Sequence, residues 1–423
     1  YFDQVLLQAN GTTDGGTITL IANHGDFNIQ TSVIQTNGST GRGGSIALSA
    51  ANNVTIQASS IEATGLNQGG RILIGNDANN GTLPFALLTS IDQNTYLNAA
   101  QLDQNPANHN GGFIETSGHT LSMMASINAG RGGMWLLDPT NVTINTTAGT
   151  STGSDPLLFT NQTNISATQI QTAINSGISV QIIADGTITQ TANLSFSIAS
   201  GSSASLTLDN SSGTAQAITL TGTTSNTRAG DLNLNYISNG QIKINGAINS
   251  TSTGKINVVA KTSYATNTLT TCTGGACASI YNGASGTITT KGGYVVMDAT
   301  GGSVSGTTIT IGSIQNGPIY LNAAINTTTA GTSASGAGGN FSLAASANLA
   351  SGIGSFEPNV ASLNIGGNAT FSLKNYTNAS YGFVVASYAT TSPITAYGNI
   401  DITSIGVSTS NNGLIYLTSA LTS

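Results

Sequence analysis

Short runs of alternating apolar and polar residues recur along the whole chain, separated by segments rich in Gly, Asn, Ser and Thr. Alternation with a period of two is typical of a β-strand that buries one face. The runs near the start of the chain come in sets of three, at 17–20, 27–29 and 32–35, then at 46–48, 54–57 and 60–62. Each set therefore predicts three short strands joined by turns.

Pairs of glycines mark a longer period. They stand at 15–16, 43–44 and 69–70, at spacings of 28 and 26 residues, a period typical of solenoid proteins. One set of three strands cannot bury its apolar residues alone, but stacked sets can. Stacking would place Ile18 on Ile46, Ile29 on Ile56, and Ile34 on Ile61. We therefore predict an all-β chain that folds as a parallel β-helix, right-handed as parallel crossovers usually are.

The regularity of the pattern divides the chain into three parts. Residues 1–147 are expected to form regular coils, with an excursion at 77–110 that contains an apolar patch. Residues 148–180 are less regular, and a helix is predicted at 167–176, with Ser166 and Gln169 as a capping box and Gly177 as its stop. Residues 181–423 are expected to continue the β-helix with longer loops between coils.

Charge is scarce in this sequence. Only 6% of the residues are charged, against about 25% in ordinary soluble domains, and the 16 acids and 9 bases are scattered singly. No basic stripe exists, so nucleic acid is not an expected partner. The apolar content of 38% argues against disorder. The chain begins with Tyr1 and ends within a predicted strand, so we expect it to be an interior piece of a longer polypeptide.

The acidic residues do not suggest catalysis. Glycoside hydrolysis, a reaction that β-helices can host, needs two carboxylates beside one bond. Here Asp185, Asp209 and Asp231 stand about one coil apart and no histidine-bearing strand accompanies them. We therefore predict a protein that is not an enzyme and has no cofactor or bound transition metal. Structural Ca²⁺ at a corner stays open, because backbone carbonyl ligands leave no trace in a sequence.

Two kinds of covalent modification are suggested by short motifs. Cys272 and Cys277 flank Thr-Gly-Gly-Ala, which suits a tight disulfide loop in an oxidising compartment, with two free thiols as the alternative. Asn-x-Ser/Thr acceptor sequences are frequent, and possible glycosylation sites are Asn53, Asn141, Asn145 and Asn193.

One region carries a specific sequence signal, formed by "GGFIETSGH" at 111–119 and "WLLDPTNVTI" at 135–144. These two segments closely resemble the filamentous-haemagglutinin-like exoproteins of two-partner secretion, especially the high-molecular-weight adhesins. The helical segment at 165–177 is also similar to one that follows the motif in that family. The motif residues are Gly111, Gly112, Glu115, Thr116, Ser117, Gly118, His119, Trp135, Leu136, Leu137, Asp138 and Pro139.

The resemblance implies an extracellular β-helix, secreted across the outer membrane through a two-partner secretion transporter. It implies a structural rod of an adhesin that mediates surface attachment, haemagglutination or biofilm formation. The expected partners are receptors or glycans on host or neighbouring cells, with the chain itself as a further candidate partner. The alternative is a subunit of a self-assembling extracellular filament or sheath, because solenoid ends expose strand edges. The motif itself is expected to be structural, with Trp135 filling the coil interior and Asp138-Pro139 turning the chain out of a strand.

Overall fold

The computed structural model contains two compact units. Unit 1 comprises 1–188 and 202–207, and unit 2 comprises 189–201 and 208–423. The residues that the structure describes are 1–76, 81, 83–103, 105, 109–146, 162–213, 216–265, 278–314, 317–329, 338–347, 356–358, 362–375, 383–385, 394–406, 415–417 and 421–422.

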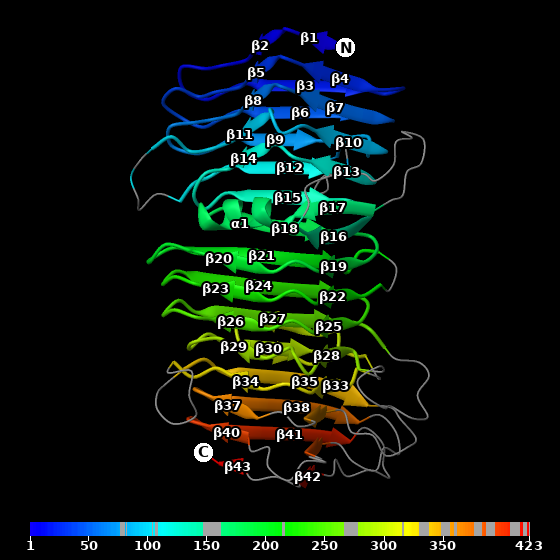
Figure 1. Ribbon diagram of the computed structural model, residues 1–423, viewed down its shortest axis with the longest axis vertical. Coiled ribbons are helices and arrows are strands. Elements are labelled where there is room, and N and C mark those ends of the chain that lie inside the picture. Colours follow the sequence, from blue (N-terminus) through cyan, green and yellow to red (C-terminus); the bar gives the residue numbers. More distant parts are fainter. Residues whose placement is uncertain are drawn as a thin grey trace. The chain divides into compact units, whose positions relative to one another are not determined.

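Unit 1 is a stack of coils in which like strands pair in parallel (Figure 1). One sheet contains β1 (Phe2–Asp3), β4 (Phe27–Gln30), β7 (Asn53–Gln57), β10 (Leu88–Ile91) and β13 (Thr120–Met123). A second contains β2 (Leu6–Gln8), β5 (Val33–Gln35), β8 (Ser60–Glu62), β11 (Tyr96–Asn98) and β14 (Ser126–Asn128). A third contains β3 (Thr17–Ala22), β6 (Ser45–Ala50), β9 (Arg71–Ile74), β12 (Phe113–Ser117), β15 (Met134–Asp138) and β18 (Ser179–Ile183).

The register between coils follows the sequence repeat. Ile18 pairs with Ile46, Ile29 with Ile56, and Ile34 with Ile61, as the Gly-Gly period predicted. The corners are tied in the same way by asparagine side chains. Oδ1 of Asn10 accepts a hydrogen bond of 2.7 Å from the backbone N–H of Asn37, and Oδ1 of Asn37 accepts one of 2.8 Å from that of Thr64. An asparagine side chain in one coil therefore accepts a hydrogen bond from the backbone of the next coil.

Unit 2 repeats this arrangement, and its like strands again pair in parallel. One contains β22 (Ile218–Leu220), β25 (Ile242–Ile244), β28 (Ile280–Asn282), β33 (Ile319–Leu321) and β36 (Phe356–Pro358). Another contains β20 (Leu194–Phe196), β23 (Thr224–Asn226), β26 (Ile248–Ser250), β29 (Ile288–Thr289), β34 (Ile325–Asn326), β37 (Leu363–Ile365), β40 (Ile394–Ala396) and β43 (Leu421–Thr422). A third contains β24 (Asp231–Ser238), β27 (Ile256–Thr262), β30 (Val295–Asp298), β35 (Phe341–Ala347), β38 (Ala369–Asn375) and β41 (Ile400–Gly406).

A few further strands and one helix are not among the sheet members named above. The strand pair β39 (Phe383–Val385) and β42 (Ile415–Leu417) is parallel, whereas β31 (Ser303–Ser305) and β32 (Thr308–Thr310) form an antiparallel hairpin. Strands β19 (Ile188–Gln190) and β21 (Ser203–Asn210) contain residues of both units. In unit 1, β16 (Asn141–Asn145) pairs in parallel with β17 (Gln162–Ser166), which leads directly into the helix α1 (Ala167–Asn175).

The core of each unit consists of inward-pointing aliphatic side chains. In many strands every second residue is buried, as in the fully alternating burial of β24 and β27. Trp135 in unit 1 and Tyr236 in unit 2 are the largest of the fully buried side chains. Burial of each Ile, Leu or Val stabilises the fold by roughly 1.5–3 kcal/mol before the entropy of ordering is counted. The prediction of an all-β parallel β-helix is thus confirmed, and its handedness stays a prediction.

The predicted excursion at 77–110 is too wide. Strands β10 and β11 lie inside it and pair with β7 and β8 as ordinary members of their coil. The described residues just before β10 lie over the third sheet, where Oγ of Ser49 donates a hydrogen bond to the carbonyl oxygen of Pro84. The extra residues between β9 and β10 lengthen this coil and so hide its period in the sequence.

The helix is present, but its predicted capping box is wrong. Ser166 stands at the N-cap position without a side-chain capping bond, because it is also the last residue of β17 and is buried. Nε2 of Gln169 donates to the carbonyl oxygen of Ala125 instead. The stop is as predicted, because Gly177 takes a φ of 82° and the N–H of Ile178 bonds to Ala173. In the described part of the chain, no helix has the length and apolar character needed to cross a membrane.

Candidate functional site

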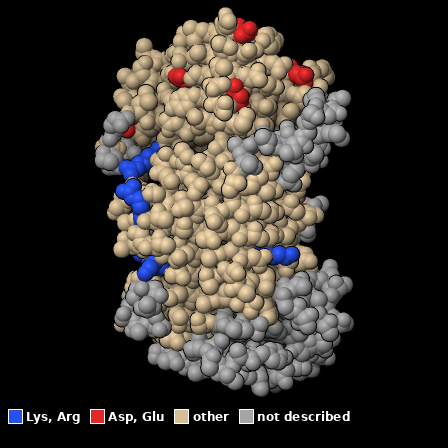
Figure 2. All heavy atoms as spheres, in the orientation of Figure 1, with Lys and Arg blue, Asp and Glu red and all other residues tan. Residues whose placement is uncertain are grey.

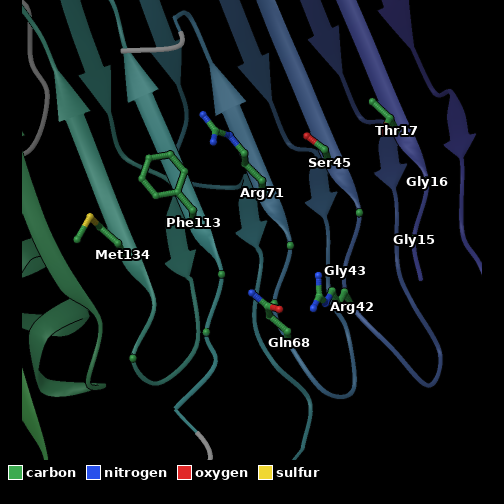
Figure 3. A pocket seen from close by; sticks show the side chains of 16 residues that line it. Gly15, Gly16, Thr17, Arg42, Gly43, Ser45, Gln68, Arg71, Phe113 and Met134 are labelled. Carbon is green, nitrogen blue, oxygen red and sulfur yellow. The ribbon is translucent and has the colours of Figure 1, made fainter. Parts of the chain in front are cut away.

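The clearest candidate site is a groove in unit 1, floored by stacked glycine pairs (Figure 3). Its volume is about 480 Å³. Its lining residues are Gly15, Gly16, Thr17, Arg42, Gly43, Gly44, Ser45, Gln68, Gly69, Gly70, Arg71, Gly111, Gly112, Phe113, Gly132 and Met134. We call it the glycine groove. It crosses the corners that lead into β3, β6, β9, β12 and β15.

Steric crowding explains the glycines of the floor. A Cβ added to Gly43 would lie 2.1 Å from the carbonyl oxygen of Ala63, and one added to Gly69 would lie 2.0 Å from that of Ala99. Neither distance is possible between non-bonded atoms, so any side chain here would push the backbone of a coil aside. Glycine is therefore required at Gly43 and Gly69 by the close approach of the chain to itself.

The backbone N–H groups of the floor glycines already donate hydrogen bonds within the protein. The N–H groups of Gly43 and Gly44 donate to Gln68 and Thr36, and the N–H of Arg71 donates to Gly44. The neighbouring coil repeats the pattern, where the N–H of Gly70 donates to Ala63. An anionic ligand in the glycine groove would therefore find these N–H groups occupied and would be held by side chains on the walls.

One wall consists of the first residues of five adjacent strands. Thr17 pairs with Ser45, Ser45 with Arg71, Arg71 with Phe113, and Phe113 with Met134. The guanidinium carbon of Arg71 lies 5.1 Å from the centroid of the Phe113 ring, a cation–π contact that orients the arginine along the wall. Figure 3 shows these side chains as a row beside the glycine floor.

The glycine groove has positive charge. It is lined by Arg42 and Arg71, and none of its lining residues is Asp, Glu, His or Cys. The carboxylate nearest in sequence is Asp14, whose Oδ1 accepts a hydrogen bond of 2.7 Å from the backbone N–H of Arg42. Two guanidinium groups and an aromatic ring in one groove suit the binding of an anionic, partly apolar ligand. The lining residues include no acid–base pair for a reaction.

The family-like motif forms two adjacent strands, and its glycines help to build the glycine groove. Strand β12 contains Glu115, Thr116 and Ser117, and β15 contains Trp135 to Asp138. They pair in parallel, so that Glu115 faces Leu136 and Ser117 faces Asp138 across the ladder. Trp135 is fully buried, as predicted for a side chain that fills the coil interior, and its Nε1 donates a hydrogen bond of 3.0 Å to Oγ1 of Thr116.

The outward side of these strands holds buried polar groups. Glu115 and Ser117 are fully buried, and Oγ of Ser117 donates a hydrogen bond of 3.0 Å to Oε1 of Glu115. Burial raises the pKa of Asp138 from its ordinary value of 3.8 to about 6, against the opposing effect of a hydrogen bond from Nδ2 of Asn76. The negative charge of Asp185 adds to the increase in this pKa.

The remaining motif residues lie within or just after strands β12 and β15. Gly118 donates its N–H to the carbonyl oxygen of Asp138, and Leu136, Leu137 and Pro139 are buried. Nδ1 of His119 lies 3.2 Å from Oγ1 of Thr140, and its ring centroid lies 4.3 Å from that of Phe85. Asp138-Pro139 ends β15, as predicted for a turn. These contacts give the motif a packing role within unit 1.

The predicted glycosylation sites have different surroundings. Asn193 is exposed, and its Oδ1 accepts a hydrogen bond from the N–H of Thr223. Asn141 and Asn145 are half-buried and bond to Thr187 and Asn164, and Asn53 is half-buried in β7. Modification at these four positions stays a prediction. Cys272 and Cys277, with their predicted disulfide, lie outside the described residues.

Comparison of the chain with models of protein families, with curated proteins and with solved structures finds no match. Among the described residues, no three His, Cys, Asp or Glu side chains come together as metal ligands.

Sequence reasoning found the motif but missed the glycine groove. The signal was present, because each Gly-Gly pair is followed at once by a residue of the wall: Thr17, Ser45, Arg71 and Phe113. Aligning the repeats by their glycines would have placed these residues in one row. What could not be foreseen is that Arg42 and Gln68, at the ends of the preceding corners, would line the same groove.

Proposed function

We propose that this chain is a structural segment of a secreted, adhesin-type bacterial exoprotein that acts at the cell surface in attachment or cell–cell contact. The observation that carries the proposal is the glycine groove, an open surface across five coils with two arginines and an aromatic ring on its walls. A groove along the stacking direction suits an extended ligand, such as a surface polymer with carboxylate or sulfate groups.

Two further observations agree with this proposal. The motif that resembles the haemagglutinin-like exoproteins supplies Gly111 and Gly112 to the groove floor. Charged side chains on the visible face are few (Figure 2), so that uncharged surface dominates. By the resemblance, the proposed partners are an outer-membrane two-partner secretion transporter and receptors or glycans on other cells.

An attachment assay tests the proposal. Beads coated with the 423-residue chain are expected to adhere to epithelial or bacterial cell layers more strongly than albumin-coated beads. Arg42→Gln combined with Arg71→Gln should reduce this adhesion at least about tenfold, because two charge-assisted contacts are lost. Arg228→Gln with Lys243→Gln, which removes the same charge from unit 2, serves as the matched control. Adhesion no greater than that of albumin beads would contradict the proposed function.

A further inference from the structure

A second, smaller pocket lies in unit 2 beneath the hairpin β31–β32. The hairpin leaves the coil between β30 and β33, and its strands pair Ser303 with Thr310 and Ser305 with Thr308. Gly306 begins the two-residue turn with a φ of 57°, a conformation that glycine adopts without strain. Strand β32 lies against β35, so the hairpin covers part of the outer face of its sheet.

The pocket has a volume of about 250 Å³. The hairpin supplies Thr307, Thr308 and Ile309, and the other lining residues come from β35, β38 and the corners that precede them. No lining residue is charged. Typical pockets for drug-sized ligands measure roughly 300–1,000 Å³, so this pocket suits a ligand of about one sugar unit.

Two asparagines of the pocket are held in a fixed orientation. Oδ1 of Asn340 accepts a hydrogen bond of 2.9 Å from the backbone N–H of Asn368, and Oδ1 of Asn368 accepts one of 3.0 Å from that of Asn399. Because a backbone N–H can only donate, the oxygen of each amide must face it. The amide nitrogens of Asn340 and Asn368 are therefore directed away from these bonds, as donors already oriented before a ligand arrives.

Hydroxyl groups supply the rest of the polar lining. Thr370 of β38 pairs with Ser342 of β35, and Ser372 pairs with Ala344, so that their hydroxyls occupy alternate positions on the same outer face. Together with the threonines of the hairpin, they can both donate and accept hydrogen bonds. Sugar hydroxyls need such two-way partners, and Ile309 adds an apolar side for the C–H groups of a ring.

From this arrangement we propose that the pocket beneath hairpin β31–β32 binds one neutral pyranose unit. The absence of charge among its lining residues favours a neutral sugar over an acidic one, in contrast to the glycine groove of unit 1. The proposal goes beyond the attachment function and does not depend on it, because the two sites lie in different units and have different ligand chemistry.

Binding of simple glycosides to the full chain tests this proposal. The probes are the methyl glycosides of glucose, galactose and mannose, with methyl glucuronide as the charged comparison, in saturation-transfer NMR and calorimetry. At least one neutral glycoside should bind saturably and more tightly than the glucuronide. Thr370→Val combined with Ser372→Ala should weaken that binding at least about tenfold, since two hydroxyl partners are removed.

Thr395→Val is the matched control, because Thr395 is likewise half-buried but belongs to β40 of another sheet. Circular dichroism should show the strand content of all variants unchanged. If no neutral glycoside binds, or if the double variant binds as well as the parent chain, the proposal is wrong. Either result would leave the bead-adhesion test of the attachment function unaffected, so the two proposals can fail separately.

Discussion

Trp135 and Thr116 are joined by a hydrogen bond of 3.0 Å between the indole Nε1 and the threonine Oγ1, inside unit 1 and away from solvent. The bond crosses from one coil to the next. Thr116→Val keeps the shape of the side chain but leaves the indole N–H without this acceptor. We expect the variant to lose about 1–3 kcal/mol of stability, as is usual for an unsatisfied buried donor. Urea denaturation followed by the fluorescence of Trp135, the single tryptophan, measures this loss.

A double-mutant cycle separates the hydrogen bond from packing. In a Trp135→Phe background, followed by circular dichroism, Thr116→Val should cost far less, because no donor remains to be satisfied. Thr55→Val, at a half-buried outward position of β7, should be nearly neutral. An equal cost of Thr116→Val in both backgrounds would show that the hydrogen bond contributes nothing.

Asp138 should make unit 1 less stable as the pH rises. Its pKa is about 6 in the folded chain and returns to 3.8 on unfolding, so the folded state binds the extra proton between these values. Stability therefore falls as pH increases through this window, by at most about 3 kcal/mol. Asp138→Asn keeps an acceptor for Asn76 and should remove this pH dependence, raising stability at pH 7.

Denaturation midpoints between pH 4 and 7 measure this effect through the fluorescence of Trp135. Asp3→Asn, at an exposed carboxylate of β1, should leave the pH dependence of the parent chain unchanged. A parent chain whose stability is flat, or rises, between pH 4 and 6 would be inconsistent with a buried Asp138 carboxylate.

Gly43 and Gly16, two floor glycines from different pairs, should differ sharply in their tolerance of a side chain. A Cβ at Gly43 would meet the carbonyl oxygen of Ala63 at 2.1 Å, whereas one at Gly16 would have its nearest neighbour, the carbonyl oxygen of Ala9, at 3.0 Å. Gly43→Ala should therefore cost about 1–3 kcal/mol or more through forced backbone movement. Gly16→Ala should be close to neutral, because the reduced freedom of the unfolded chain offsets a slight crowding. Thermal denaturation measures the melting temperature of both variants, and equal melting temperatures would refute the crowding argument.

Tyr236 offers a substitution that should stabilise unit 2. Its side chain is fully buried in β24, its hydroxyl has no hydrogen-bond partner among the described residues, and burial raises its pKa above the ordinary value. Tyr236→Phe removes a polar group that is buried without compensation, so we expect a gain of about 1 kcal/mol. Tyr281→Phe, at a half-buried position of β28, provides the comparison. A less stable Tyr236→Phe chain would reveal a partner for the hydroxyl.

The fold could be predicted from the sequence because its information is local and repeated. Alternation in 17–20 and 46–48 set the inward side of each strand, and the Gly-Gly period set which isoleucine lies on which. The same logic failed at 77–110, where the inserted residues displaced β10 and β11 from the expected spacing. It failed again at Ser166, because a capping pattern cannot show that the residue also ends a strand.

The candidate sites were harder to foresee because they depend on residues from different coils. Arg42 and Phe113 are far apart in the sequence and share the glycine groove only through stacking. The pocket in unit 2 depends on the hairpin around Gly306, whose sequence "SVSGTTIT" has the alternation and central glycine of a tight β-hairpin. That signal predicts a hairpin, but it does not indicate which face of the coil the hairpin covers.

The asparagine bonds at the corners of unit 1 have a mechanical consequence. Asn10, Asn37 and Thr64 are linked one coil at a time, with 27 residues between successive links. A force applied along the stack would therefore break the links in series, beginning at the outermost coil. Each rupture would release roughly 90 Å of extended chain while the coils behind it stay folded. Such a chain would lengthen under tension before it fails.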